Sequence, residues 1–466
     1  MTNDKSYYFC GIGGSGMLPL AMIVRESGAT VSGSDRALDQ GRLAAKFKWL
    51  KAKGVGLFAQ DGSGLISGDQ ILIASAAIED SVPDVAKAKA LGCARMTRAE
   101  LLAQQFNASP RSIAIGGTSG KSTVTGMIGW ILTEADFDPT IMNGAVMKNF
   151  VADDAPFASS RVGDGGIMVS EVDESDGSIA LFNPEIAVLN NVSLDHKSLE
   201  ELRQLFGDFA SKAQYCVWNR DDAETAALVS GLDLENAISF GFSEGAELRA
   251  VNIEEAPLSS SFILEAEGAE FLVELQVPGR HNIANALAAI AASIAVGVPM
   301  TIAIAAIANF TGLARRFDVV GTANEISVID DFGHNPDKIS ATLQTMKAFP
   351  GRIIAFFQPH GFGPIHKMGA ELAQVFVDLL DGDDRVILCD PVYFGGTVDR
   401  SIGSESIVDA VNAAGGTAKH IADRADCGAH MIDIAQPGDR IVIMGARDDT
   451  LSLFASDILA KLAAKQ

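Results

Sequence analysis

The stretch IAIGGTSGKST, residues 113–123, decides the fold. Apolar residues typical of a buried strand run into a glycine-rich loop, and the residues beyond the loop are compatible with a helix. In a phosphate-binding loop of this kind, backbone N–H groups and the positive end of the helix face the phosphates of a nucleotide. The loop departs from the strict GxxxxGK[ST] pattern, because Ile115 occupies the position of the first glycine.

The polar residues of this loop carry the expected chemistry. Lys121 is placed to reach the β- and γ-phosphates of ATP, and Ser122 is placed to offer its hydroxyl to Mg²⁺. The predicted ATP-binding residues of the loop are Gly117, Thr118, Ser119, Gly120, Lys121, Ser122 and Thr123.

A run of acidic residues that begins at Glu171 follows the apolar strand at residues 167–169. Carboxylates crowded beside a buried strand repel one another unless a cation is present. Glu171 is therefore the expected partner of Mg²⁺ together with Ser122, and a solvated acidic loop is the alternative. His196 follows the apolar strand at residues 186–189 and is either a ligand of a second metal ion or the cap of the next helix.

A second glycine-rich loop, GIGGSG at residues 11–16, lies between a short apolar strand and a predicted helix. Glycines in this GxGxxG pattern let a diphosphate approach the helix N-terminus, and an acid after the next strand, here Asp35, can bind a ribose hydroxyl. These residues alone leave open whether the nucleotide is NAD or a UDP-sugar. A glycine turn with only a structural role is the alternative.

Strands and helices are expected to alternate along the whole chain, which is typical of parallel sheets covered by helices. Interruptions at residues 107–110 and near 311–317 suggest domain boundaries. The predicted fold class is α/β, with a Rossmann-like domain at residues 1–108, a central P-loop-type ATPase domain at 109–314 and a Rossmann-like C-terminal domain at 315–466. Three domains also suit a chain of 466 residues, with two large domains as the alternative, since single cores stop growing at roughly 250–300 residues.

Composition excludes some classes of partner. A formal net charge of −23 disfavours general affinity for nucleic acid or anionic membranes. The five cysteines are scattered and contain no CxxC pair, which fits a reducing cytoplasm, and the amino terminus lacks the pattern of a signal peptide. A cytoplasmic location is expected, and the oligomeric state stays open.

Residues 283–308 are apolar enough to require a membrane test, because a span needs about 20 continuous apolar residues. Gly297, Val298 and Pro299 interrupt the run, and proline breaks the interior of a helix. We predict two alanine-rich buried helices here and no membrane span.

Three later segments carry weaker signals. The segment GRHNIANA places Asn282 and Asn285 on one helical face, where their amides could contact an adenine edge and a phosphate oxygen. The segments RRFD and DDFGHNP contain Arg316 and Asp331. An arginine near a domain boundary could reach across to ATP.

Taken in this order, the segments resemble the Mur ligase family over nearly the whole chain. The motifs that carry the resemblance are GIGGSGM, SGSD, ASAAI, RAE, EVDESD, NxxxDH, GRHNxxNA, RRFD and DDFGHNP. They are most similar to the branch that extends UDP-N-acetylmuramate with L-alanine or with a preformed peptide.

The resemblance implies an ATP-dependent ligase of peptidoglycan synthesis or recycling. ATP would convert the muramyl carboxylate to an acyl phosphate, which an amine then attacks with release of phosphate. The implied catalytic residues are Lys121, Glu171 and His196, and the implied metal ligands are Ser122, Glu171 and His196. Contacts with ATP or roles in domain closure are implied for Asn282, Asn285, Arg316 and Asp331.

The resemblance also implies a UDP-sugar rather than NAD at the first loop. The residues expected to bind it are Gly11, Gly13, Gly14, Ser15, Gly16, Ser34, Asp35 and Ser75. The C-terminal domain would bring the amine, with His334 and His360 as candidates. Some family members use a carbamylated lysine near the position of Lys212, but the surrounding residues fit the branch that lacks it, so Lys212 is expected to be an ordinary surface residue.

Departures from the family pattern concern the acceptor. His360 is followed by GFGP, whereas alanine-adding members carry arginines just after that histidine, and the segment GARDD at residues 445–449 departs from a glycine-rich pattern. In the ATP loop, this branch usually has histidine before the glycine and threonine after the lysine; Ser122 keeps the hydroxyl. The identity of the amine therefore stays open.

Other functions remain as alternatives. A Mur-like ligase could join another carboxylate and amine. A nicotinamide-dependent dehydrogenase would explain the first loop and Asp35, but it leaves Lys121 and Glu171 unexplained. A non-catalytic nucleotide-binding paralogue would keep both loops and lose the acceptor site.

Overall fold

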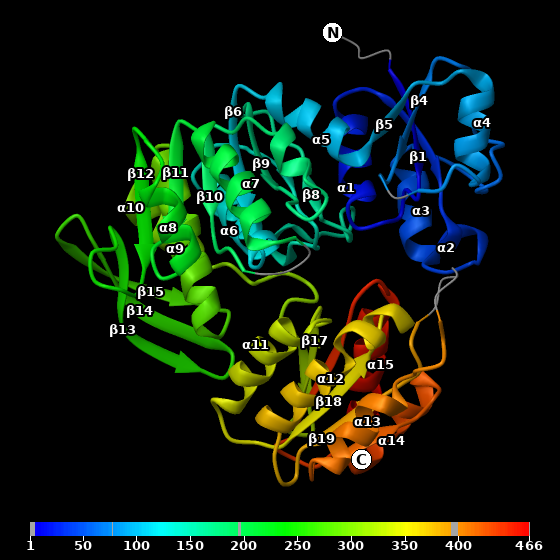
Figure 1. The fold of residues 1–466 in the computed structure, drawn as a ribbon, viewed down its shortest axis with the longest axis vertical. Coiled ribbons are helices and arrows are strands. Elements are labelled where there is room, and N and C mark those ends of the chain that lie inside the picture. Colours follow the sequence, from blue (N-terminus) through cyan, green and yellow to red (C-terminus); the bar gives the residue numbers. More distant parts are fainter. Residues whose placement is uncertain (1–4, 77, 194–196, 393–398, 466) are drawn as a thin grey trace. The chain divides into compact units, whose positions relative to one another are not determined.

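The computed structural model describes residues 5–76, 78–193, 197–392 and 399–465. Three sheets flanked by helices make up the chain, so the predicted α/β class with three sheet-containing domains is confirmed (Figure 1). The chain divides into two compact units, Met1–Glu255 with Ser259–Gly312, and Leu313–Gln466 with Ala256–Leu258. The first two sheets lie in the first unit and the third sheet lies in the second.

The first sheet has five parallel strands in the order β3-β2-β1-β4-β5. Its strands are β1 (Ser6–Cys10), β2 (Thr30–Ser34), β3 (Gly56–Phe58), β4 (Gln70–Ala74) and β5 (Arg95–Thr97). Its helices are α1 (Met17–Glu26), α2 (Arg36–Asp39), α3 (Ala44–Ala52), α4 (Pro83–Leu91) and α5 (Arg98–Asn107). Apolar side chains of α1, α3 and α5 pack on one face and those of α4 on the other. The central strand β1 opens at its carboxyl end into the GIGGSG loop.

The second sheet has ten strands in the order β15-β14-β13-β12-β11-β10-β6-β9-β7-β8. The strands are β6 (Arg111–Gly116), β7 (Thr140–Met142), β8 (Ser160–Arg161), β9 (Ile167–Glu171), β10 (Ile186–Leu189), β11 (Tyr215–Asn219), β12 (Ala237–Gly241), β13 (Leu248–Ala256), β14 (Ser259–Ala266) and β15 (Ala269–Leu275). The helices are α6 (Lys121–Glu134), η1 (Lys148–Phe150), η2 (Ser178–Leu181), α7 (Leu199–Ser211), α8 (Ala223–Ser230), α9 (Arg280–Ala295) and α10 (Met300–Ile307). The loop at residues 113–123 thus follows β6 in the middle of the sheet, between β9 and β10.

Strict alternation of strands and helices is wrong for part of this sheet. From β12 to β15 the strands follow one another without an intervening helix, and β14 pairs with β15 as an antiparallel hairpin. Side chains of β14 alternate between buried and more exposed positions. This alternation is typical of a strand with one face buried and the other exposed to solvent.

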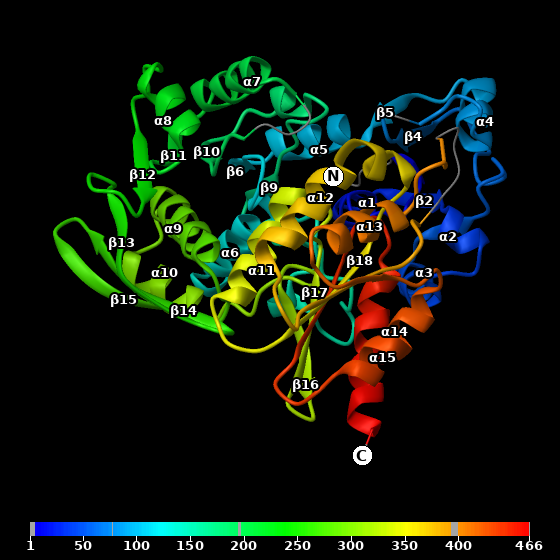
Figure 2. The same cartoon turned by 60° about the horizontal axis from the view of Figure 1, so that its bottom comes forward.

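The third sheet has the order β16-β17-β21-β18-β19-β20, and only β16 runs antiparallel to its neighbour. Its strands are β16 (Asp318–Ala323), β17 (Ile326–Asp331), β18 (Ile353–Gln358), β19 (Arg385–Leu388), β20 (Ala418–His420) and β21 (Arg440–Gly445). Its helices are α11 (Pro336–Lys347), α12 (Phe362–Leu379), α13 (Glu405–Ala413), α14 (Arg424–Ile434) and α15 (Thr450–Ala464). Helices α11, α12 and α13 cover one face, and α14 and α15 cover the other (Figure 2).

The apolar run at residues 283–308 forms two buried helices, as predicted. Helix α9 ends at Ala295 and α10 begins at Met300, with the turn that contains Pro299 between them. Among the described residues, we find no helix with the length and apolar character that a bilayer crossing requires.

Candidate active site

The candidate ATP loop lies at the carboxyl edge of the second sheet. Strand β6 ends at Gly116 and α6 begins at Lys121, so residues 117–120 form the turn between them. Gly117 and Gly120 have φ angles of +139° and +82°, which glycine adopts without the steric cost that a side chain would add. Because β9 and β10 run parallel to β6 on either side, the ends of all three strands meet at this loop.

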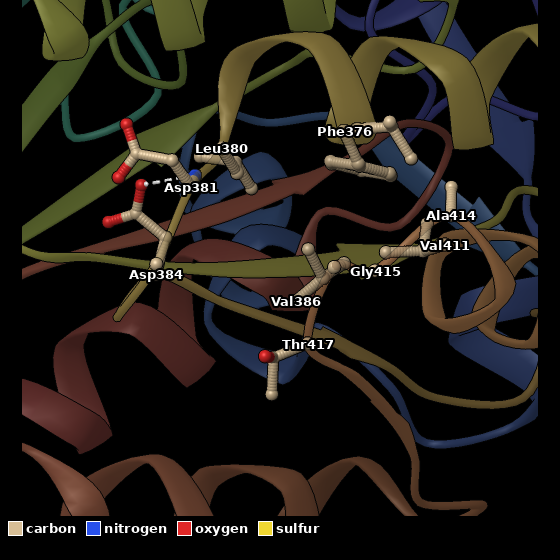
Figure 3. A pocket seen from close by; sticks show the side chains of 12 residues that line it. Phe376, Leu380, Asp381, Asp384, Val386, Val411, Ala414, Gly415 and Thr417 are labelled. Atoms are coloured by element: carbon tan, nitrogen blue, oxygen red, sulfur yellow. Dashed lines mark hydrogen bonds between the residues drawn. The ribbon is translucent and has the colours of Figure 1, made fainter.

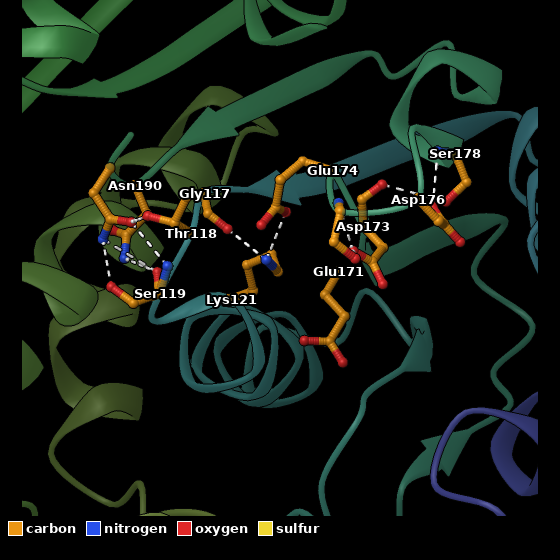
Figure 4. Close-up of polar contacts among 12 residues, drawn as sticks. Gly117, Thr118, Ser119, Lys121, Glu171, Asp173, Glu174, Asp176, Ser178 and Asn190 are labelled. Atoms are coloured by element: carbon orange, nitrogen blue, oxygen red, sulfur yellow. Dashed lines mark hydrogen bonds and ion pairs between the residues drawn. The ribbon is translucent and has the colours of Figure 1, made fainter. Parts of the chain in front are cut away.

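Lys121 is held over the loop by two oxygens (Figure 4). Its Nζ donates to the carbonyl of Gly117 at 2.5 Å and to Oε2 of Glu174 at 2.7 Å. Glu174 is 4% exposed, and burial raises the pKa of its carboxyl although the neighbouring Lys121 ammonium acts in the opposite direction. These two contacts place the lysine nitrogen at the point where the loop would receive phosphates.

Ser122 and Glu171 face each other at the start of α6 and the end of β9. The Ser122 hydroxyl donates to Oε2 of Glu171 at 2.7 Å. A Cβ on Gly144 would collide with Oε1 of Glu171 and would lie 3.6 Å from the Ser122 hydroxyl, so glycine at this position leaves room beside both groups. One hydroxyl and one carboxylate form a donor set that fits Mg²⁺, which prefers oxygen ligands.

The other acids of the cluster have local structural partners. Asp173 accepts hydrogen bonds from the backbone N–H and the hydroxyl of Ser175, and Asp176 accepts from the N–H of Ser178. Those hydrogen bonds lower the pKa of Asp173 against the raising effect of its burial. His196, the candidate second metal ligand, lies outside the described residues. Thr123 lies half-buried in the first turn of α6.

Two asparagines to which the sequence interpretation gave no role organise the loop; one of them, Asn191, is the asparagine of the NxxxDH motif. The Asn191 side chain accepts from the Thr118 hydroxyl at 2.9 Å and from the Ser119 N–H at 2.8 Å. Asn190 donates to the Ser119 carbonyl at 3.0 Å. Both follow β10 directly, and their position at the end of a strand beside β6 was the signal that could have identified them.

Asn285 and Asn282 lie on the inner side of the same loop. Asn285 Oδ1 accepts from Asn190 Nδ2 at 3.1 Å, and its Nδ2 donates to Asn282 Oδ1 at 3.2 Å. A Cβ on Gly120 would lie 2.6 Å from Asn285 Oδ1 and would collide with Asn190 Nδ2. The structure thus brings both predicted asparagines of α9 to the loop, where they support its shape through Asn190.

The GIGGSG loop is closed by Asp35. Its two carboxylate oxygens accept from the N–H groups of Gly13 and Ala37, both at 2.8 Å, and the buried Lys46 ammonium donates to the Gly13 carbonyl at 3.1 Å. Gly14 and Ser15 are exposed, whereas Gly11 and Gly16 are half-buried.

Ser34 and Ser75 differ in accessibility. Ser34 is fully buried, and its hydroxyl donates to the buried carboxylate of Asp84, which also accepts from the N–H of Gly62. Ser75 is exposed just beyond the end of β4. Lys212 is also exposed and donates to the carbonyl of Ala180, as expected of a surface residue.

In the second unit, the two adjacent arginines have different surroundings. Arg315 is 8% exposed, and its guanidinium donates to the carbonyl of Gly445 at 2.6 Å and to that of Asp448 at 3.2 Å. The Arg316 guanidinium lies over the ring of Phe332, 4.4 Å from its centroid. The sequence interpretation singled out Arg316 and missed the structural role of Arg315.

Asp331 and the two candidate histidines lie at the carboxyl edge of the third sheet. Asp331 is buried and accepts from the N–H groups of Phe317 and Gly333 and from the Thr342 hydroxyl. The rings of His334 and His360 lie edge to face with centroids 5.3 Å apart. Burial is the first cause that lowers the pKa of His334 to about 3 and that of His360 to about 4, so both rings are neutral at pH 7.

A cavity of about 150 Å³ also occurs in the second unit (Figure 3). It lies near Val386 and Asp384 at the beginning of β19, the opposite end of the sheet from the histidines. Asp384 already accepts from the Ile353 N–H at 2.7 Å and pairs with Lys347 at 3.0 Å. The cavity is therefore a structural hollow apart from the candidate site.

Three models of the Mur ligase family match the chain: the family's catalytic domain at residues 6–109, its middle domain at 115–293 and its glutamate ligase domain at 315–447. The chain belongs to the Mur ligase family. The UDP-N-acetylmuramate–L-alanine ligases of Agrobacterium fabrum and Streptomyces coelicolor are each 33% identical to this Mur ligase, over 95% of this chain and 94% and 95% of theirs.

Solved structures share the fold of this Mur ligase. The UDP-N-acetylmuramate–alanine ligase of Thermotoga maritima superposes with a TM-score of 0.80 at 23% identity, covering 98% of both chains. A murein peptide ligase of Psychrobacter arcticus superposes with a TM-score of 0.73 at 24% identity, covering 98% of this chain and 99% of the other. These likenesses establish the architecture.

Family membership confirms the resemblance that the motifs indicated. This Mur ligase is an ATP-dependent, ADP-forming ligase, which removes the dehydrogenase alternative. The basic and hydroxyl groups of the ATP loop suit that chemistry, because phosphoryl transfer depends mainly on positioning and on neutralising charge.

Proposed function

We propose that this Mur ligase joins the carboxylate of UDP-N-acetylmuramate to the amine of an amino acid or a peptide, with ATP and Mg²⁺. The observation that carries the proposal is the arrangement at the carboxyl edge of the second sheet, where Lys121 and Ser122 begin α6 and the Ser122 hydroxyl contacts Glu171 at the end of β9. UDP-N-acetylmuramate is proposed as the substrate because it is the substrate named for the curated relatives.

The proposed roles follow from the contacts. Lys121 neutralises the phosphates of ATP after exchanging Glu174 for them, and the backbone N–H groups of residues 117–120 bind the same phosphates. Ser122 and Glu171 hold Mg²⁺, which supplies charge neutralisation when bound. Asn190 and Asn285 keep the loop in the shape that these contacts require.

The carboxylate that is to be activated is a poor electrophile until one of its oxygens becomes part of a phosphate leaving group. We propose that the reaction proceeds through such an acyl phosphate, and that exclusion of water protects it from hydrolysis. Arg316, Asp331, His334 and His360 all belong to the second unit. We propose that Arg316 and Asp331 contribute to closure over the nucleotide and that His334 and His360 help to receive the amine.

The remaining assignments are part of the same proposal. The nucleotide sugar binds at the GIGGSG loop through exposed Gly14 and Ser15, with Asp35 holding the loop in place. We also propose domain boundaries after residues 108 and 314.

A panel assay tests the function. Phosphate release is measured with ATP, Mg²⁺ and UDP-N-acetylmuramate in the presence of L-alanine, glycine, L-serine or the L-Ala–D-Glu–diaminopimelate tripeptide. Release that requires both the nucleotide sugar and one amine supports the proposal and identifies the acceptor. ATP binding without release for any member of the panel contradicts it and favours a different substrate pair or a non-catalytic role.

A further inference from the structure

The carboxyl ends of β17, β21 and β18 lie side by side in the third sheet. Strand β21 pairs in parallel with both neighbours, and Met444 is level with Asp331 of β17 and Phe357 of β18. The chain leaves β17 and β18 for α11 and α12 on one face, and it leaves β21 for α15 on the other. Ligands of open α/β sheets bind where neighbouring connections diverge in this way, so the loop after β21 occupies a favoured ligand position.

Arg447 stands in that loop with a backbone that does not suit an arginine. Its φ angle is +59°, in the left-handed region that favours glycine. The loop is fixed on both sides of Arg447, because Arg315 donates to the carbonyls of Gly445 and Asp448. Arg447 is itself exposed, so burial of its side chain does not explain why an arginine occupies this position.

Arg447 is one of three cationic side chains whose charges act on the two histidines. The pKa of His360 is lowered first by burial and then by the charges of Arg447 and Lys338. The pKa of His334 is lowered first by burial, and the charges of Lys338 and Arg316 add to this effect. Asp448 and Asp449 follow Arg447 directly, and Asp448 is already paired with Arg424 at 2.9 Å.

One ring nitrogen of the histidine pair has no hydrogen-bond partner among the described residues. His334 Nδ1 lies 2.8 Å from the carbonyl of Phe332, so that nitrogen is used within the protein. His360 Nδ1 is buried and has no hydrogen-bond partner within the described part of the chain. A buried polar atom of this kind is normally satisfied, which points to a ligand at this edge of the sheet.

We propose that Arg447 binds the carboxylate of the amine acceptor and thereby selects amino acids or peptides that carry a free carboxylate near the reacting amine. The inference rests on the proposed ligase function, and it places acceptor recognition on the loop after β21. Arginine suits this role, because its guanidinium matches a carboxylate with two parallel hydrogen bonds.

The key variant is Arg447→Gly, which removes the guanidinium and restores the residue that the backbone favours. It should fold at least as well as the wild type, so its thermal midpoint should be equal or higher. Arg447→Lys keeps the charge without the planar fork. Arg385→Ala is the matched control, because it removes one positive charge at the beginning of β19, the opposite edge of the sheet.

The measurement compares each acceptor with its C-terminal amide, using L-alanine and the L-Ala–D-Glu–diaminopimelate tripeptide as probes. In the wild type the free acid should be preferred. Arg447→Gly should raise the KM for the acid by about 10–100-fold, as expected for the loss of a charge-assisted hydrogen bond, and should abolish the preference over the amide. The KM values for ATP and for the nucleotide sugar should not change.

Direct binding separates this inference from the ligase proposal. Calorimetric titration of the full chain with the same acids and amides requires no turnover. If wild-type protein prefers the acid and Arg447→Gly does not, Arg447 is the carboxylate site even if the panel assay is silent. Equal affinity or KM for the acid in wild type and Arg447→Gly, binding of neither probe, or an equal loss in Arg385→Ala would overturn the inference.

Discussion

Replacing Gly120 by alanine places a methyl group at a crowded point of the ATP loop. The added Cβ lies 2.6 Å from Asn285 Oδ1, against 3.4–4 Å for an ordinary contact, and closer still to Asn190 Nδ2. Those two atoms are hydrogen-bonded to each other at 3.1 Å, so the methyl group fits only if the pair separates or the loop moves. Either response alters the conformation of the loop and therefore the positions of its N–H groups.

Two terms set the magnitude. The φ angle of +82° at Gly120 costs an alanine about 1–2 kcal/mol. Separating Asn190 from Asn285 takes away the hydrogen bond that the buried Asn285 Oδ1 accepts, which adds about 1–3 kcal/mol. We therefore expect a loss of about 2–5 kcal/mol in the stability of the loop conformation. Since 1.4 kcal/mol corresponds to about tenfold in affinity, ATP should bind at least tenfold more weakly.

Gly92→Ala is the matched control. Gly92 has a similar φ of +71° at the end of α4, and a Cβ there meets no atom within 4 Å. It carries the conformational cost without the collision. ATP affinity is measured by calorimetric titration, with circular dichroism to check that both variants are folded. An ATP affinity of Gly120→Ala within twofold of the wild type, or an equal loss in Gly92→Ala, would refute the reasoning.

Three further outcomes are expected. Lys121→Ala should reduce turnover, measured as phosphate release, at least about a hundredfold. It should also lower the thermal midpoint, because the buried Glu174 carboxylate loses its partner. Adding Glu174→Gln to this variant should restore the thermal midpoint but not the turnover. Asn191→Ala should raise the KM for ATP with little change in the thermal midpoint. His334 and His360 have folded pKa values of about 3 and about 4, below the unfolded value of 6.5. The unfolded state therefore binds more protons, and stability falls as the pH drops below 6.5, by about 1.4 kcal/mol for each ring at pH 5.5. Denaturant unfolding between pH 7.5 and 5.5 should show a smaller decline in stability for the double variant His334→Gln/His360→Gln than for the wild type.

The local features of the site could be predicted because they depend on neighbours in sequence. The strand, the glycines and the helix around Lys121 occupy one continuous segment, and Pro299 marks the break between α9 and α10 within a few residues. The sequence also predicted that Ser122 and Glu171 share a metal ion, and the structure places their side chains in contact across 49 residues. Both lie where strands of a parallel sheet end at one edge.

The remaining contacts depend on partners that are distant in sequence. Asn190 reaches Ser119 across 71 residues, and Ser34 is buried by a hydrogen bond to Asp84 across 50. Nothing in the pair Arg315-Arg316 indicates which guanidinium turns inward, because that choice depends on the carbonyls of the loop after β21. Side-chain burial of this kind follows from packing and not from local pattern.

The contacts of Lys121 also predict a proton change on nucleotide binding. Its ammonium is the ion-pair partner of Glu174 at 2.7 Å, and burial already raises the pKa of that carboxyl. When phosphates take over Lys121, the carboxyl loses the neighbour that holds its pKa down, so the pKa rises further and Glu174 takes up a proton. Calorimetric titration with ATP in buffers of different ionisation enthalpy should show proton uptake by the wild type. Glu174→Gln should bind ATP with that uptake removed, whereas the same uptake in this variant would show that the proton goes elsewhere and that Lys121 keeps its partner.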